Sequence, residues 1–238
     1  MKLLVTIPGI GNNHFDDKKV FLRKNIEIIK NTFTGSVDFL LFNYSDNDFS
    51  EFQDENIKII KERGIIGQYI FNNLKPEYVS KYDYVILMLD DILLSEDFNI
   101  DYLVKIYKDN NLNIISPSLS VDSKFSHMFM LNDDKYKNSL RIVNFCEYFF
   151  YLMDTDSYSK YWNLFDDKTY WLWGIDLCLD IQGFKMGIFN DFKIKHFYIS
   201  ESYNKNLPSP SIEMYNKGIK FGKIKEMINR YIKIINNK

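Results

Sequence analysis

Residues 84–91 read Tyr-Val-Ile-Leu-Met-Leu-Asp-Asp, an apolar run that ends in two adjacent carboxylates. A short run that is apolar throughout and flanked by polar residues is typical of a central strand buried on both faces. Two carboxylates at the end of such a strand repel each other, and a hard divalent cation would relieve the cost of burying them. The alternative is a solvated loop in which Asp90 or Asp91 caps a turn. The stretch predicts a buried strand with a candidate metal site at its end.

Other short apolar runs lie on both sides of this strand, at residues 3–7, 37–42, 57–60 and 114–115. Segments with helix-like spacing alternate with them, at residues 18–33, 69–78 and 103–107. The second half is less regular. Strands that alternate with helices predict an α/β fold with a mostly parallel, doubly wound sheet and helices on both faces. In such folds, ligands bind at the carboxyl ends of the strands.

Two further segments carry candidate site residues. Residues 171–176, Trp-Leu-Trp-Gly-Ile-Asp, place Asp176 beside an apolar wall, which raises a carboxylate pKa and suits a general base. The alternative is an aromatic core segment in which Asp176 caps the next helix. His196 closes a predicted strand at residues 192–197, where it is either a metal ligand or a structural histidine.

Length and composition limit the possible classes. The 238 residues suit one α/β domain or a domain with a small appendage, and the formal net charge of −2 argues against a nucleic-acid partner. Cys146 and Cys178 lack metal-ligand spacing, so we expect buried free thiols in a reducing compartment. The N-terminal apolar run is too short for a signal sequence, and no run approaches membrane-spanning length, so a cytoplasmic protein is expected.

In their order along the chain, these motifs resemble those of GT-A glycosyltransferases. The resemblance extends to a poorly characterised GT-A-like family found in plants, bacteria and large DNA viruses. Four segments carry it, over about residues 3–205: Ile-Ser-Pro-Ser-Leu at 115–119, Asn-Phe-Cys-Glu-Tyr-Phe-Phe at 144–150, Trp-Gly-Ile-Asp at 173–176, and 183–196 with its terminal His196. One departure is Leu89, which stands where the family's D-x-D motif has its first acid.

The resemblance implies a metal-dependent hexosyl- or deoxyhexosyltransferase. Such an enzyme moves a sugar from a nucleoside-diphosphate sugar to a hydroxyl acceptor such as a glycan. Asp91 and His196 would hold Mn²⁺ or Mg²⁺, which neutralises charge on the leaving diphosphate. Asp176 would deprotonate the acceptor hydroxyl, with inversion at the anomeric carbon.

The nucleotide is expected over the carboxyl ends of the first strands. Thr6, Pro8 and Gly9 are candidates to line it, together with Asp90 of the acidic motif. Arg63 precedes a glycine and could reach the diphosphate, although plain surface charge is the slightly favoured alternative.

Residues 1–210 are predicted to form the catalytic domain, and residues 211–238 a basic amphipathic helix. We expect that helix to pack on the domain; peripheral contact with an anionic membrane is the alternative. Two other functions remain open at this point. One is a metal-dependent nucleotide-sugar hydrolase, and the other is a catalytically silent domain that binds a glycan or protein, which the missing first acid favours.

Overall fold

The computed structural model describes residues 1–11, 13–125, 127–172, 174–198, 209–221 and 233–236. Its strands are β1 (Lys2–Ile10), β2 (Ser36–Asn43), β3 (Ile57–Lys61), β4 (Tyr84–Met88), β5 (Ile92–Leu94), β6 (Ile114–Leu119), β7 (Ser139–Val143), β8 (Phe150–Asp154), β9 (Met186–His196) and β10 (Lys233–Asn236). Its α-helices are α1 (Phe15–Thr32), α2 (Ile66–Asn73), α3 (Pro76–Val79), α4 (Ile100–Asp109), α5 (Thr155–Trp162), α6 (Ile175–Cys178) and α7 (Pro210–Phe221). Short 3₁₀ turns lie at Ser50–Phe52, Met128–Met130 and Asp134–Tyr136.

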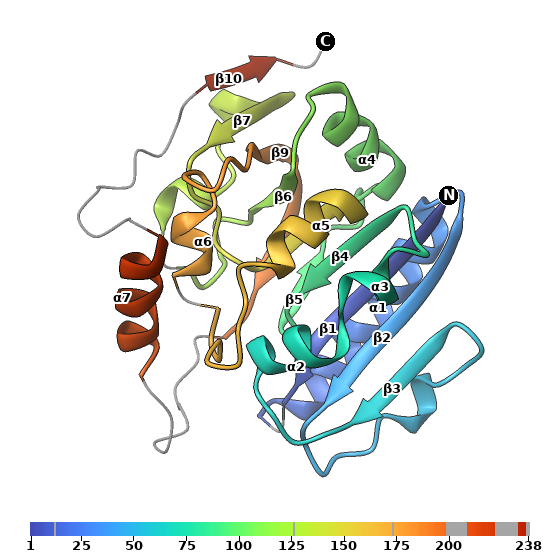
Figure 1. Ribbon diagram of the computed structural model, residues 1–238. Coiled ribbons are helices and arrows are strands. Elements are labelled where there is room, and N and C mark those ends of the chain that lie inside the picture. The colour runs from blue at the N-terminus through green and yellow to red at the C-terminus, as the bar shows by residue number, and fades with distance from the viewer. Residues whose placement is uncertain (12, 126, 173, 199–208, 222–232, 237–238) are drawn as a thin grey trace.

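The strands form one ten-stranded sheet in the order β10-β7-β9-β6-β8-β4-β1-β2-β3, with β5 paired to β9. Strands β3, β2, β1 and β4 are parallel, as the alternation of strands and helices predicts. Strand β8 then runs antiparallel between β4 and β6, and β9 lies parallel to β6. Helices α1 and α4 pack on one face of the sheet, and α2, α3 and α5 on the other (Figure 1). The predicted fold class is confirmed.

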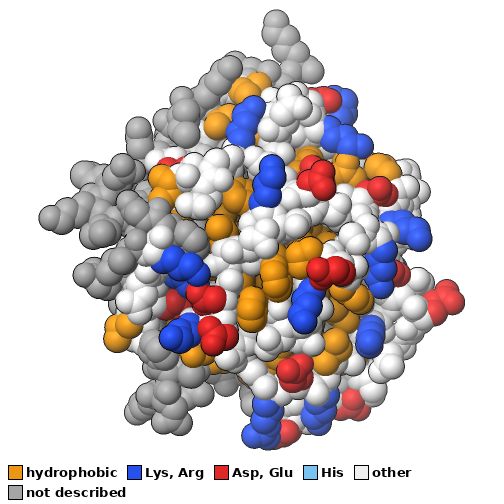
Figure 2. Space-filling model, in the orientation of Figure 1, with side chains coloured by type: hydrophobic (Ala, Val, Ile, Leu, Met, Phe, Trp, Pro, Cys, Tyr) orange, Lys and Arg blue, Asp and Glu red, His pale blue; other side chains and the backbone are white. Residues whose placement is uncertain are grey.

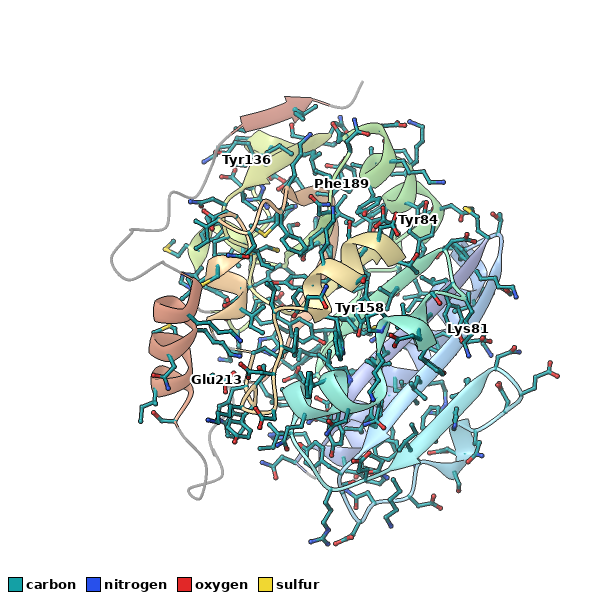
Figure 3. The ribbon with its side chains drawn as sticks, in the orientation of Figure 1. Lys81, Tyr84, Tyr136, Tyr158, Phe189 and Glu213 are labelled. Atoms are coloured by element: carbon teal, nitrogen blue, oxygen red, sulfur yellow. The ribbon has the colours of Figure 1, made fainter. Side chains whose placement is uncertain are left out.

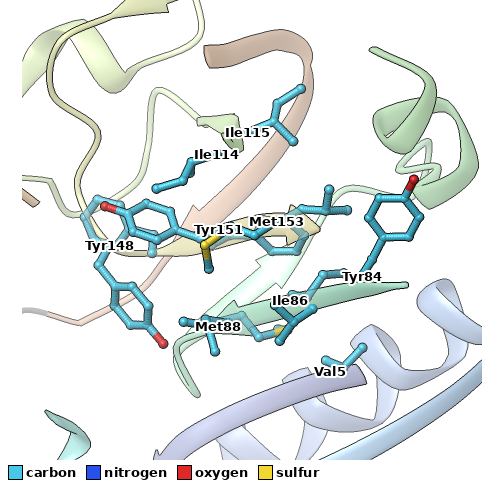
Figure 4. Close-up of a cluster of buried hydrophobic side chains, with 14 of the residues drawn as sticks. Val5, Tyr84, Ile86, Met88, Ile114, Ile115, Tyr148, Tyr151 and Met153 are labelled. Atoms are coloured by element: carbon cyan, nitrogen blue, oxygen red, sulfur yellow. The ribbon is translucent and has the colours of Figure 1, made fainter. Parts of the chain in front are cut away.

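The core surrounds the strand that the sequence placed at the centre. Every residue of β4 is buried, because β1 and β8 pair with its two edges and side chains cover both faces. Figure 4 shows β4 side chains packed against Val5 of β1 and Met153 of β8, and both of these side chains are fully buried. Burial on both faces is the physical reason that residues 84–88 lack the polar alternation of a half-exposed strand.

Strand β1 does not end at Pro8 and Gly9, as the apolar run predicts, but continues to Ile10. Its register with β2 skips between Ile7 and Ile10. Proline cannot donate to the ladder, and Gly9 adopts φ 129°, so the two residues form an irregularity within the strand instead of its end.

The C-terminal prediction of one continuous amphipathic helix is wrong at its end. Helix α7 stops at Phe221, and Lys233–Asn236 form β10, antiparallel to β7. Residues 222–232 lie outside the described part of the chain, so packing of this segment on the domain stays a prediction, with membrane contact as its alternative. No helix among the described residues is long and apolar enough to span a bilayer. Figure 2 shows basic and acidic side chains interspersed on one face, and not gathered by sign.

The short strand β5 was not predicted, and a buried asparagine of α1 holds it in place. Asn25 is 3% exposed. Its Nδ2 donates to the carbonyl of Ile92 at 2.8 Å, and its Oδ1 accepts from the amide of Leu94 at 2.9 Å. The Asn25 side chain therefore pairs with one backbone carbonyl and one backbone amide of β5, the strand that directly follows the acidic pair.

Replacement of Asn25 tests this anchor. Asn25→Ala leaves two buried backbone groups unpaired, and each unpaired group costs about 1–3 kcal/mol, so we expect the free energy of unfolding to fall by about 2–6 kcal/mol. Urea denaturation measures it. Asn31→Ala, at an exposed position of the same helix, is the matched control and should change stability by less than about 0.5 kcal/mol. Equal effects of the two changes would show that β5 does not depend on Asn25.

Candidate active site

The pairing of β5 with the end of β9 brings Asp91 and His196 together. Ile92 lies opposite His196 in the antiparallel register, and the amide of Phe197 donates to the Asp91 carbonyl at 3.1 Å. As a result, Asp91 Oδ2 lies 3.3 Å from His196 Nε2, and the two side chains are 15% and 11% exposed. Two residues far apart in the sequence thus form one polar pair at the carboxyl ends of β4 and β9.

A loop after β6 fixes the orientation of the His196 ring. Nδ1 lies 2.7 Å from the carbonyl oxygen of Lys124, and the Lys124 amide donates to the His196 carbonyl at 2.8 Å. A carbonyl only accepts, so Nδ1 carries a proton and Nε2 faces Asp91. Burial lowers the pKa of His196, but the hydrogen bond and charge of Asp91 outweigh burial, so the pKa stands above its ordinary value.

The Asp91–His196 pair fits a divalent metal. Asp91 Oδ1 is buried and has no hydrogen-bond partner among the described residues, which leaves a ligand-ready oxygen. A histidine whose Nδ1 is tied to a carbonyl is the usual arrangement of a metal ligand. Carboxylate and imidazole together suit Mn²⁺. No group of three or more His, Cys, Asp or Glu side chains that could hold a metal occurs in the described residues, so substrate oxygens and water would complete the shell.

Asp90 makes a different set of contacts. Its Oδ2 accepts from the amide of Gly11 at 2.8 Å and forms an ion pair with Lys18 Nζ at 2.8 Å. Burial and the charge of Asp91 raise the pKa of Asp90, while Lys18 opposes the rise. This carboxylate therefore ties the loop between β1 and α1 to the acidic motif, next to the predicted nucleotide region.

Lys18 and Tyr44 belong to the site and were not predicted. Lys18 lies on the buried face of α1, as Asn25 does. Two polar residues within the apolar stripe of a helix are a pattern from which the sequence could have predicted their involvement. Tyr44 follows β2 and is 39% exposed. Burial and the charges of Asp90 and Asp91 raise its pKa to about 12. A Cβ at Gly11 would lie only 2.1 Å from the Tyr44 hydroxyl, so the ring crosses the loop closely.

Asp176 lies at the start of α6, and Gly174 before it adopts φ 92°. Asp176 Oδ1 accepts from the amides of Leu177 at 2.8 Å and Gly174 at 3.2 Å, so the side chain does cap the helix start. The residue as a whole is half-buried. Burial and the negative charge of Glu147 nevertheless raise its pKa to about 7. A carboxyl group with this pKa can take up a proton near neutral pH.

Glu147 is coupled electrostatically both to the Asp91–His196 pair and to Asp176. Its charge acts on both Asp176 and His196. The segment that carries it lies along the acidic motif, because the Leu89 amide donates to the Phe149 carbonyl at 3.0 Å. The Phe149 ring centre is also 4.6 Å from that of His196. The structure therefore brings Asp91 and His196 into contact and places Glu147 where its charge acts on both His196 and Asp176.

The residues that were predicted to line the nucleotide differ in their exposure to solvent. Thr6 and Pro8 are buried in β1, whereas Gly9 is partly exposed. Arg63 forms an exposed ion pair with Asp46 at 3.2 Å, on the loop that follows β2. Their contacts with a nucleotide stay predictions.

No family model matches the chain, and no curated protein matches it. Solved structures do resemble it. One is GalNAc-T7 with UDP, GalNAc and Mn²⁺, with a TM-score of 0.64, 11% identity, and coverage of 92% of this chain and 48% of that one. Another is TarS 1–349 of S. aureus, with a TM-score of 0.53, 9% identity, and coverage of 81% and 60%.

The chain thus spans about half the length of the first of these structures and 60% of the second. At such low identity the likeness concerns the fold alone. The chain has the GT-A fold.

Proposed function

We propose that the protein is a glycosyltransferase that uses a divalent metal to move a sugar from a nucleoside-diphosphate sugar to a hydroxyl acceptor. The observation that carries the proposal is the Asp91–His196 pair, joined through the charge of Glu147 to a carboxyl group with a pKa of about 7. The GT-A fold supports it. The narrower resemblance, to the GT-A-like family of plants, bacteria and large DNA viruses, stays a prediction.

Each residue has a stated role in this proposal. Asp91 and His196 would hold Mn²⁺ or Mg²⁺, which when bound would supply neutralising charge to the leaving diphosphate. Asp90 and Lys18 hold the Gly11 loop in place under the nucleotide. Tyr44, partly exposed at the edge of this loop, contacts the nucleotide.

Asp176 is the general base in the proposal. It accepts the proton of the acceptor hydroxyl as that oxygen bonds to the anomeric carbon and the bond from this carbon to the diphosphate oxygen breaks. The nucleoside diphosphate leaves from the opposite face, so the configuration is inverted. Its raised pKa matches that task better than an ordinary carboxylate would, because proton transfer is most efficient when the base has a pKa near the working pH.

Donor binding tests the first half of the proposal. A thermal-shift screen of UDP-, GDP- and dTDP-sugars with and without Mn²⁺ should show stabilisation only when both are present. A ligand at a hundred times its Kd contributes about 2.7 kcal/mol. Asp91→Asn should abolish the metal-dependent shift and keep the fold, whereas Asp97→Asn, at an exposed position nearby, should leave it unchanged. Equal shifts in the Asp91 variant and the wild type would refute the metal assignment.

Turnover tests the role of Asp176. Asp176→Asn keeps the shape of the side chain and removes the base, so donor and metal binding should persist while transfer falls by about 100-fold or more. Product analysis with and without an acceptor sugar accompanies the measurement. Undiminished transfer would leave Asp176 as a helix cap only, and free sugar as the sole product would identify a hydrolase.

The pH profile tests the link between Glu147 and Asp176. A base must be ionised to act, so the rate should rise as the pH passes through about 7 in the wild type. Glu147→Gln removes the like charge that helps to raise the Asp176 pKa, so the acid limb of the kcat profile should move to lower pH. A limb that stays in place, or moves upward, would contradict this coupling.

A further inference from the structure

Helix α7 packs beside α6, against the loop of residues 166–172 that leads to Asp176 (Figure 1). Glu213 of α7 makes the principal contact. Its side chain is 3% exposed, and its carboxylate accepts from the amide of Tyr170 at 3.0 Å and from the amide of Trp171 at 3.0 and 3.1 Å. Figure 3 shows Glu213 on the side of α7 that faces this loop. Successive backbone amides thus converge on one buried carboxylate.

A second buried charge of α7 joins the same loop. Lys217 is 4% exposed, and its Nζ lies 2.9 Å from Asp166 Oδ1 and 2.6 Å from Thr169 Oγ1. Lys220 also bonds Asp166, at 2.7 Å. Burying an ammonium or carboxylate group raises the free energy of the fold unless the charge is paired. These pairings therefore hold α7 in one position relative to the loop.

A third contact of α7 involves Gly174, the residue directly before α6. A Cβ at Gly174 would lie 2.8 Å from Met214 Cα, so the backbone of α7 packs directly on this glycine. The Gly174 amide in turn donates to Asp176 Oδ1 at 3.2 Å. The chain of contact therefore runs from α7 through Gly174 to the carboxylate of Asp176.

From these contacts we infer that Glu213 is a positioning residue, through which α7 sets the place of Asp176 in the site. The inference rests on the proposed function, in which Asp176 is the base. Glu213 lies beyond the reacting atoms and acts on the backbone of Tyr170 and Trp171. A base displaced by about 1 Å can lower the rate by about 100-fold without weakening substrate binding, so the effect belongs in kcat.

Two variants of Glu213 test the inference. Glu213→Ala removes both acceptor oxygens, and Glu213→Gln keeps one oxygen and the shape of the side chain. We expect Glu213→Ala to lower kcat by about 10- to 100-fold, with the Kd of UDP in Mn²⁺ changed by less than about twofold. Glu213→Gln should recover part of the lost rate. Glu55→Gln, at an exposed position far from α7 in the sequence, is the matched control and should leave both quantities unchanged. An unchanged kcat in Glu213→Ala, or equal losses of kcat and UDP affinity, would overturn the inference.

Hydrogen exchange at single amides gives a readout that does not depend on turnover. The amides of Gly174 and Leu177 both donate to Asp176 Oδ1, so their protection reports the position of that carboxylate. In Glu213→Ala they should exchange at least about tenfold faster, together with the amides of Tyr170 and Trp171. If only Tyr170 and Trp171 lose protection, Glu213 merely secures the loop and the inference fails. Because this comparison needs no substrate, it still decides the matter if no sugar donor is ever found.

Discussion

The antiparallel pairing of β5 with the end of β9 is the constraint on which the candidate site depends. It sets Ile92 opposite His196, and the residue before Ile92 is Asp91. Because side chains alternate between the faces of a sheet, a slip of one residue would turn His196 away from the acid. Asn25 secures β5 from α1, and the Lys124 loop secures the end of β9 from the other side. The position of Asp91 relative to His196 therefore depends on a strand of only three residues.

Each carboxylate near the site has its own electrostatic partner, and the partner decides what the carboxylate can do. Asp90 is neutralised by Lys18 and holds a loop, and Asp91 faces His196 with one oxygen left for a ligand. Glu213 is held by backbone amides. Asp176 is instead affected chiefly by burial, followed by the negative charge of Glu147, and both raise its pKa. The same functional group thus meets a different electrostatic environment at each of these four positions.

The sequence could predict those features that leave a local pattern. The apolar run before Asp90 and the alternation of strands with helices were sufficient for the fold class, because burial on both faces excludes polar residues from a strand. Strand β5 could not be predicted, since three residues are too short to show a period. The sequence pattern predicted a helix at β10, because the apolar Ile235 fits the apolar stripe of a helix as well as one face of a strand. The role of Glu213 depends on amides about 40 residues away and has no local signature.

The strand order has a consequence for the way the chain is made. Synthesis releases the N-terminal half first, and β1 to β4 can pair as soon as they emerge. One edge of β4 then stays uncovered until β8 arrives, and Asp91 has no imidazole beside it until the end of β9 is complete. Contacts across about 100 residues form slowly, and an open strand edge invites pairing with other chains. A nascent chain that stops just short of His196 would thus already carry β8 on the edge of β4 and most of the sheet, but it would lack the imidazole that faces Asp91.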